Sequence, residues 1–167
     1  MTLRFGILTV SDRSASGERV DLSGPALAQT VIEQGWQVVQ QGVLPDELTS
    51  LCELLIAWAD SGQIDIILTT GGTGFAPRDV TPEATQAVIE RAVPGLAEAM
   101  RAASLKITPH AMLSRATAGI RKRTLIVNLP GSPKAARENL QVILSVFPHA
   151  VQLLCEDPQA ESHHLPG

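Results

Sequence analysis

The sequence contains few cysteines and no long apolar run. Its 167 residues include only Cys52 and Cys155, which cannot build a disulfide scaffold at this size and whose separation fits no paired-ligand zinc motif. No segment approaches the roughly 20 apolar residues of a membrane-spanning helix. Met1 leads into a strand-like segment instead of a signal peptide. We therefore expect a soluble, cytoplasmic protein with no membrane partner and no structural metal.

Acidic residues are absent between Glu98 and Glu138, although the formal net charge of the chain is −4. The negative total argues against a nucleic-acid partner, but the locally basic segment suits a polyanionic ligand. Two interpretations of residues 121–123 stay open: a solvated turn, or part of a surface that attracts an anion. Eight basic residues lie in the segment: Arg101, Lys106, Arg115, Arg121, Lys122, Arg123, Lys134 and Arg137.

The composition favours a single folded domain. Hydrophobic residues make up 44% of the chain and charged residues 18%, so enough apolar surface is present to form a core. A chain of this length most often forms one domain, which we expect at residues 1–155. We expect a polar tail at residues 156–167, in which His163 and His164 are solvated and not metal ligands.

Strands and helices are predicted to alternate along the chain. Continuous apolar runs predict strands at residues 3–10, 36–43 and 64–68, and a hairpin at 116–120 and 124–129. Apolar residues at helical spacing predict helices that begin near Ser23, Leu48, Thr81, Leu96 and Ser132, with the last one interrupted by Pro148. Ser23, Thr81 and Ser132 are predicted N-caps. This alternation predicts an α/β fold whose mainly parallel sheet is covered on both faces, with a small antiparallel hairpin.

The loops with interesting chemistry follow the predicted strands directly. The carboxyl ends of parallel strands lie at one edge of a sheet, where such folds bind ligands. Four loops therefore converge on one crevice: residues 9–12, 44–46, 69–79 and 128–132.

A glycine-rich loop, Gly71-Gly72-Thr73-Gly74, follows the third predicted strand. Glycines there let backbone N–H groups approach an anion without a Cβ in the way, which favours a phosphate site. No Gly-Lys-Ser/Thr sequence follows and position 77 is proline, so neither a Walker loop nor a dinucleotide fingerprint is present. The alternative is a tight turn that needs positive φ.

A second phosphate site is predicted where a helix begins after Gly131. Free N–H groups and the positive end of the helix dipole would face the crevice there, and Lys134 would add a full charge. The alternative is an ordinary helix capped by Ser132 and started by Pro133, which leaves the pairing of Gly131 with Lys134 unexplained.

Asp46 and Asp79 lie on loops at the same predicted edge. Two carboxylates beside a phosphate-binding loop commonly hold Mg²⁺. Other roles stay open for each: Asp46 could cap the helix that begins at Glu47, and Asp79 could brace Arg78 or cap toward Thr81. Asp12 has the same ambiguity.

Taken together, these residues resemble the molybdopterin adenylyltransferase family of molybdenum cofactor biosynthesis. The resemblance extends over nearly all of residues 3–154 and places every motif in the same order. The matching motifs are Thr9-Val10-Ser11-Asp12-Arg13 with Ser16-Gly17, Asp21 and Gly24; Pro45-Asp46-Glu47; residues 69–74; residues 78–84; Ser114-Arg115; Gly119-Ile120; and residues 128–135.

The resemblance implies a three-layer α/β/α sandwich, a homotrimer, and Mg²⁺-dependent transfer of AMP from ATP to the terminal phosphate of molybdopterin, with release of pyrophosphate. Asp46 and Asp79 would be the catalytic and metal-binding residues. A separate molybdate-insertion protein could act downstream on the product. The implied residues that bind the pterin and the nucleotide phosphates are Ser11, Asp12, Thr70, Gly71, Gly72, Thr73, Gly74, Thr81, Glu83, Ser114, Arg115, Asn128, Pro130, Gly131, Ser132 and Lys134.

Two other functions are weighed against this one. A noncatalytic molybdopterin-binding or scaffold paralogue would share the fold and both glycine loops, but the presence of both Asp46 and Asp79 argues against it. A nucleotide pyrophosphohydrolase or deamidase of the same fold would need a water-activating group that the sequence does not reveal. Leu54 and Trp58 could lie at a subunit interface, or could pack within one subunit as part of a broad helical stripe.

Overall fold

A computed structural model describes residues 1–156 and 158 of the chain. Within these residues a single six-stranded sheet has the order β2-β1-β3-β6-β5-β4. The first four strands of that order are parallel, β5 runs antiparallel to β6, and β4 runs antiparallel to β5. The strands are β1 (Arg4–Val10), β2 (Gln37–Leu44), β3 (Ile66–Thr70), β4 (Arg91–Ala92), β5 (Ala118–Arg121) and β6 (Thr124–Leu129).

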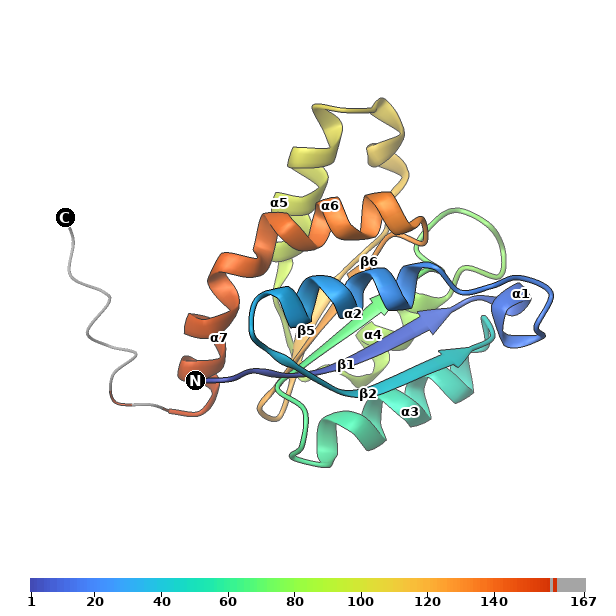
Figure 1. Cartoon of the computed structure of the whole chain (residues 1–167). Coiled ribbons are helices and arrows are strands. Elements are labelled where there is room, and N and C mark those ends of the chain that lie inside the picture. Colours follow the sequence, from blue (N-terminus) through green and yellow to red (C-terminus); the bar gives the residue numbers. More distant parts are fainter. Residues whose placement is uncertain (157, 159–167) are drawn as a thin grey trace.

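Helices cover both faces of this sheet, as Figure 1 shows. α2, α5, α6 and α7 lie on one face, and α3 and α4 lie on the other. The α-helices are α1 (Asp12–Ala15), α2 (Ser23–Glu33), α3 (Leu48–Asp60), α4 (Thr81–Val88), α5 (Pro94–Leu105), α6 (Pro133–Ile143) and α7 (Phe147–Leu154). Two short 3₁₀ helices are η1 (Pro109–Leu113) and η2 (Leu144–Val146).

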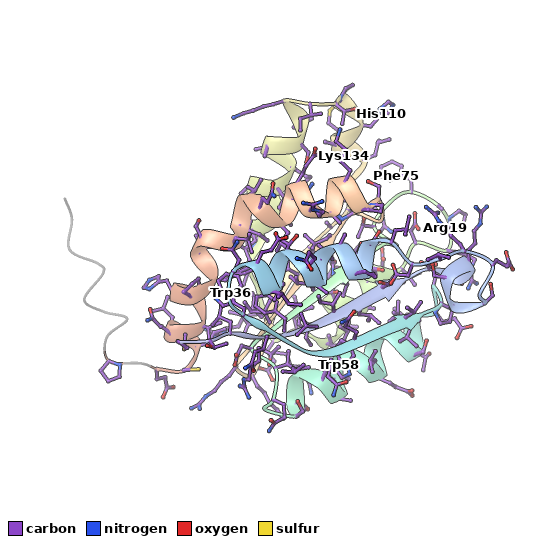
Figure 2. All side chains as sticks on the ribbon, viewed as in Figure 1. Arg19, Trp36, Trp58, Phe75, His110 and Lys134 are labelled. Atoms are coloured by element: carbon purple, nitrogen blue, oxygen red, sulfur yellow. The ribbon has the colours of Figure 1, made fainter. Side chains whose placement is uncertain are left out.

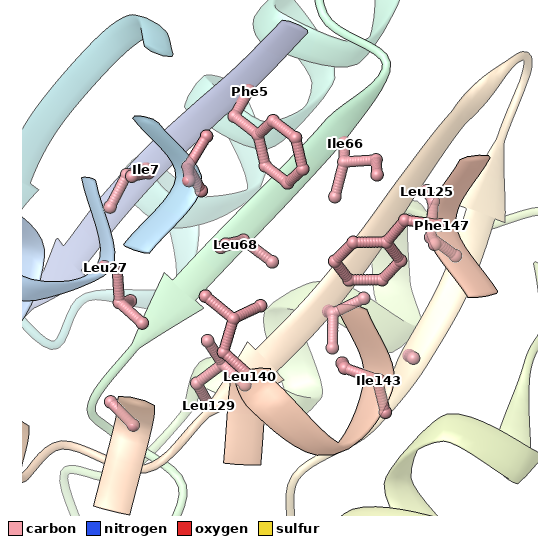
Figure 3. Close-up of a cluster of buried hydrophobic side chains, with 14 of the residues drawn as sticks. Phe5, Ile7, Leu27, Ile66, Leu68, Leu125, Leu129, Leu140, Ile143 and Phe147 are labelled. Atoms are coloured by element: carbon pink, nitrogen blue, oxygen red, sulfur yellow. The ribbon is translucent and has the colours of Figure 1, made fainter. Parts of the chain in front are cut away.

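Two hydrophobic cores result from the alternation of side chains along the central strands. In β1, Phe5 and Ile7 point into the core under α2, α6 and α7, whereas Leu8 and Val10 point into the core above α3 and α4. β3 and β6 alternate in the same way. Figure 3 shows Phe147 of α7 and Leu140 of α6 packed over β3 and β6. The predicted three-layer α/β/α sandwich with a mainly parallel sheet and an antiparallel hairpin is therefore confirmed.

Two of the three predicted N-caps are wrong. α2 begins at Ser23, and it is the Asp21 carboxylate that accepts the N–H groups of Ser23 and Gly24, at 3.1 and 3.0 Å. α4 begins at Thr81, whose hydroxyl donates to the Gly71 carbonyl at 2.8 Å. The third cap is confirmed, because Ser132 Oγ accepts the N–H of Ala135 at 3.2 Å.

Some segments differ from the sequence-based expectation. The polar loop after β1 contains α1, Pro94 starts α5 two residues earlier than expected, and Pro148 lies in the first turn of α7 instead of only ending a helix. Leu54 and Trp58 pack against their own core, and the Trp58 ring lies where a Cβ on Gly6 would be. Both side chains are only partly buried within the subunit, and their role at a subunit interface stays a prediction.

The domain limits stay predictions. Most of the expected tail, including His163 and His164, lies outside the described residues. Across residues 1–156 and 158, no helix has both the length and the apolar character needed to traverse a lipid bilayer.

Candidate functional site

The carboxyl ends of β1, β2, β3 and β6 border a crevice of about 350 Å³. The loops that form it extend beyond the arrowheads of these strands in Figure 1. The crevice lies at the edge that the order of strands and helices predicted. The predicted site residues that line it are Ser11, Asp46, Thr70, Gly71, Gly72, Asp79, Gly131 and Ser132.

A second, mostly apolar cavity of about 310 Å³ lies between α5, η1 and α6. Thr73, Gly74, Ser114 and Pro130 line it, so four more predicted residues face this cavity instead of the crevice. The glycine loop and the loop at residues 130–131 therefore separate two hollows.

The glycine loop is held close to the strand ends. Gly71 and Gly72 have φ values of +101° and +66°, which L side chains rarely adopt. Thr70 Oγ1 donates to the Pro130 carbonyl at 2.6 Å, and the Gly71 N–H donates to the Leu129 carbonyl at 3.2 Å. The interpretation as a tight turn that needs positive φ is therefore confirmed for Gly71 and Gly72. The same turn also forms part of the crevice wall.

Asp12 and Asp46 hold each other in place. The Asp12 N–H donates to Asp46 Oδ2 at 3.1 Å, and the Asp46 N–H donates to Asp12 Oδ1 at 3.0 Å. The capping role for Asp46 is thus wrong, because α3 begins at Leu48 without a side-chain cap. Burial raises the pKa of Asp46; the N–H bond from Asp12 opposes this rise, and the charges of Asp12 and Asp79 add to it.

One oxygen of the Asp46 carboxylate is left without a partner. Asp46 Oδ1 is buried and accepts no hydrogen bond from any described residue. It lies beside Gly72, where an added Cβ would come within 2.9 Å of it. A buried carboxylate oxygen without a donor is costly, and a bound cation would satisfy it.

Arg78 pairs with Asp12 and not with Asp79. Its Nε and Nη2 atoms donate to the two Asp12 oxygens at 2.6 and 2.8 Å, and this ion pair lowers the pKa of Asp12. The Asp79 carboxylate instead accepts the N–H of Ala76 at 2.9 Å. Asp79 thereby closes its own loop and keeps a face toward the crevice.

The crevice fits a magnesium ion that arrives with a phosphate-bearing substrate. Among the described residues, no group of three or more His, Cys, Asp or Glu side chains is placed to hold a metal. Mg²⁺ often takes only one or two carboxylates and fills its other positions with water and phosphate oxygens. Asp46, with its unpartnered oxygen, and Asp79 would be those carboxylates.

Arg115 clamps the glycine loop to the Asp79 segment. Its Nε donates to the Gly74 carbonyl and its Nη2 to the Asp79 carbonyl, both at 2.7 Å, while Nη1 pairs with Glu83. Its own N–H donates to the Thr73 carbonyl at 2.9 Å. Arg115 and Glu83, which the resemblance implies as substrate-binding residues, are thus engaged in holding the loop.

Asn128 and Thr81 lie beneath the crevice. Asn128 is completely buried; its Nδ2 donates to Thr69 and Thr85 at 2.9 and 2.8 Å, and its Oδ1 accepts the N–H of Thr117 at 3.2 Å. Thr81 is buried below Gly71. The structure therefore gives both side chains a supporting position.

Lys134 extends from the solvent face of α6. Its side chain is 83% exposed and lies 3.9 Å from Glu138, one turn along the helix. It is not part of the crevice wall, although Gly131 and Ser132 are. The prediction that Lys134 captures substrate phosphate has no support from this arrangement.

Arg19, Asp21 and Ser23 are among the crevice-wall residues that sequence reasoning did not name as site residues, although it quoted Asp21 in the family motif and Ser23 as an N-cap. Asp21 Oδ2 accepts the Thr9 hydroxyl at 2.7 Å, and Ser23 Oγ donates to the Gly131 carbonyl at 2.6 Å. Asp21 precedes Ser23 by two residues and Gly24 by three, and an aspartate in this position before a helix is a capping signal. Asp21 could therefore have been identified from the sequence as the cap of this helix.

The basic cluster at residues 121–123 lies at the other end of the sheet, in the turn between β5 and β6. Arg121 is more than a solvated residue: its guanidinium donates to both Asp60 oxygens, at 2.8 and 2.9 Å, and to the Val88 carbonyl at 3.0 Å. Lys122 also pairs with Asp60. Arg121 and Lys122 therefore bind this end of the hairpin to α3, and Arg121 also binds it to α4, away from the crevice.

We expect Arg121→Gln to destabilise the fold without changing ligand binding. The Arg121 bond lowers the pKa of Asp60, so the pair stabilises the folded state above the ordinary pKa of aspartate, about 4. That contribution is lost as the pH falls through the lowered pKa. Urea unfolding at several pH values should show a deficit at pH 7 that disappears in acid. Arg123→Gln is the control, and an equal deficit for both variants would contradict the assignment.

Comparisons with known proteins show the family to which this chain is related. A family model described as a probable molybdopterin binding domain matches residues 6–149. The molybdopterin adenylyltransferase of Helicobacter pylori is 43% identical over 155 residues, covering 92% of this chain and 88% of the relative. Gephyrin of Dictyostelium discoideum is 45% identical over 171 residues; the match covers 95% of this chain but 24% of gephyrin.

A solved structure has the same fold over almost its whole length. The molybdopterin biosynthesis enzyme MoaB of Thermus thermophilus superimposes with a TM-score of 0.88 at 50% identity, covering 94% of this chain and 99% of that one. The family model covers most of the strands and helices that build the crevice. The chain therefore belongs to the family of probable molybdopterin-binding domains.

Proposed function

We propose that the protein is a molybdopterin adenylyltransferase. In this reaction a terminal phosphate oxygen of molybdopterin attacks the α-phosphorus of ATP, AMP is transferred, and pyrophosphate leaves. The observation that carries the proposal is that Asp46, which has a buried oxygen without a partner, and Asp79 both line one crevice beside the glycine loop. The relative from Helicobacter pylori, which carries this name and is 43% identical, supports it.

The crevice offers what such a transfer requires. Phosphoryl-type transfer depends more on positioning and charge neutralisation than on covalent chemistry. Magnesium, when bound, would supply positive charge at the phosphates. The reciprocal bonds between Asp12 and Asp46 fix the orientation of one carboxylate, and Arg115 fixes the loop that carries the other. The chain thus holds both carboxylates in place before substrates arrive.

The test is to incubate the purified protein with molybdopterin, ATP and Mg²⁺. We expect adenylylated molybdopterin and pyrophosphate in equal amounts, and neither product when Mg²⁺ is chelated. Binding of molybdopterin without release of pyrophosphate would instead identify a binding or scaffold paralogue. Release of phosphate or pyrophosphate from ATP without molybdopterin would indicate a hydrolase.

We also propose that the protein forms a homotrimer, as the resemblance implies. The end of α5 and the segment through η1 project from the body of the subunit in Figure 1. Large apolar side chains are exposed there, namely Leu105, Ile107, Met112 and Leu113. An exposed apolar cluster of this kind often marks a protein interface, and a second copy of this chain would cover it.

Light scattering should then give three times the 17.7 kDa mass of one chain. Charging the projecting surface, with Ile107→Asp and Met112→Asp together, should shift the mass toward that of one subunit, because a buried charge opposes association. Leu153→Asp, at an exposed site on α7, is the control. A monomer mass for the unmodified protein at micromolar concentration would defeat the proposal.

A further inference from the structure

The crevice carries more negative than positive charge. Asp21, Asp46 and Asp79 all line it, whereas Arg19 is the one lysine or arginine among the described residues of its wall. Both substrates of the proposed reaction carry phosphate groups. Positive charge from the protein, in addition to that of a metal ion, would favour binding of a polyanion beside three carboxylates.

Of the other nearby cations, Arg13 lies outside the crevice wall, and three more are engaged or face elsewhere. Arg78 forms two bonds with Asp12, and Arg115 is bonded to two carbonyls and to Glu83. Lys134 projects from the outer face of α6 beside Glu138. Each of these would have to break existing contacts, or reach around a helix, to meet a phosphate in the crevice.

The backbone of Arg19 is hydrogen-bonded, whereas its side chain makes no polar contact with any described residue. Its N–H donates to the Arg13 carbonyl at 3.2 Å, and two residues later Asp21 is fixed by Thr9 and by the start of α2. Among the described residues its guanidinium has no ion pair or hydrogen bond. Figure 2 shows Arg19 on the loop after α1, at the end of the sheet where the crevice lies.

We propose that Arg19 binds a phosphate group of a substrate in the crevice, an inference that rests on the proposed function. The planar guanidinium presents paired N–H donors that match two phosphate oxygens. On the nucleotide, this contact would bind the part that leaves as pyrophosphate and would stabilise the charge that develops there. On molybdopterin, it would bind the terminal phosphate.

The test compares Arg19→Gln with Arg13→Gln by calorimetric titration in the presence of Mg²⁺. Arg13 is an exposed arginine on the adjacent helix α1 and is outside the crevice wall, so the control removes the same charge nearby. The probes are ATP, AMP, pyrophosphate and molybdopterin. Arg19→Gln should weaken binding by about 10- to 100-fold, the usual effect of losing a charge-assisted hydrogen bond, and Arg13→Gln by much less.

The set of probes for which Arg19→Gln loses affinity identifies the phosphate group that Arg19 binds. Weaker binding of ATP and pyrophosphate with unchanged AMP places Arg19 on the leaving group, and weaker binding of molybdopterin alone places it on the terminal phosphate. Equal affinities of the two variants for all four probes would overturn the proposal. Wild-type protein that binds ATP but forms no product would refute the proposed function alone, because binding still decides the role of Arg19. Wild-type protein that binds none of the probes would overturn both.

Discussion

Replacing Asp79 by asparagine should lower the rate of adenylylation by about 100-fold or more, the usual cost of removing a group that stabilises charge in the transition state. The substitution removes one negative charge at nearly constant shape. The amide oxygen of asparagine can still accept the Ala76 N–H that closes the loop at 2.9 Å. We therefore expect a folded protein that still binds molybdopterin, and a loss confined to the chemical step and to Mg²⁺-dependent nucleotide binding.

The control is Asp60→Asn, the same chemical change at the opposite end of the sheet, where Asp60 pairs with Arg121. Initial rates of pyrophosphate release would be measured for both variants across a range of Mg²⁺ concentrations. Asp60→Asn should keep the wild-type rate while it is folded. An Asp79→Asn rate within a few-fold of wild type would show that this carboxylate has no part in the reaction.

The central strands could be predicted because strands that are buried on both faces consist almost entirely of apolar and small polar residues. Every residue of β3 and β6 is buried, so each strand is an uninterrupted apolar or small polar run. β4 could not be predicted in this way, because Arg91 and Ala92 are both exposed and form a strand only by pairing with β5. A short edge strand depends on its neighbour and leaves no pattern of its own.

The candidate site could be predicted only in part. The order of strands and loops was enough to bring Asp46, Asp79 and the glycine loop to one edge. It could not show which way each side chain points: Ser132 caps its helix at the crevice, but two residues further Lys134 has turned to the solvent face, since each helical residue rotates by about 100°.

Contacts between residues that are far apart in the chain could not be predicted from the sequence either. The bond between Arg115 and the Asp79 carbonyl joins residues 36 positions apart, and the bonds between Asp12 and Asp46 join residues 34 apart. The residues quoted for the resemblance included all four, but the sequence could not show that Asp12 and Arg115 are bonded to the segments that carry Asp46 and Asp79. Arg115 holds the loop that a substrate would touch, which only the folded geometry reveals.

Replacing Gly71 by alanine should be among the most damaging single changes in the chain. Its φ of +101° is outside the range of L side chains, and a Cβ there would lie well inside van der Waals contact of the Val10 carbonyl at the end of β1. A backbone atom in a central strand cannot move aside as a flexible side chain could. We expect a loss of at least about 3 kcal/mol in the free energy of unfolding.

Gly62→Ala separates the cost of the backbone angle from the cost of the close contact. Gly62 also has positive φ, +69°, but no atom of the residues that the structure describes lies within 4 Å of an added Cβ, so this variant should lose only about 1–2 kcal/mol. Urea unfolding of both variants measures the difference. Gly71 also packs against Gly131, where an added Cβ would lie 3.3 Å from the Gly71 Cα. A displacement of Gly71 should therefore shift the glycine loop and move Gly72 away from Asp46. This shift should weaken Mg²⁺-dependent ATP binding. Equal losses for the two variants would show that the glycine loop is not held against β1.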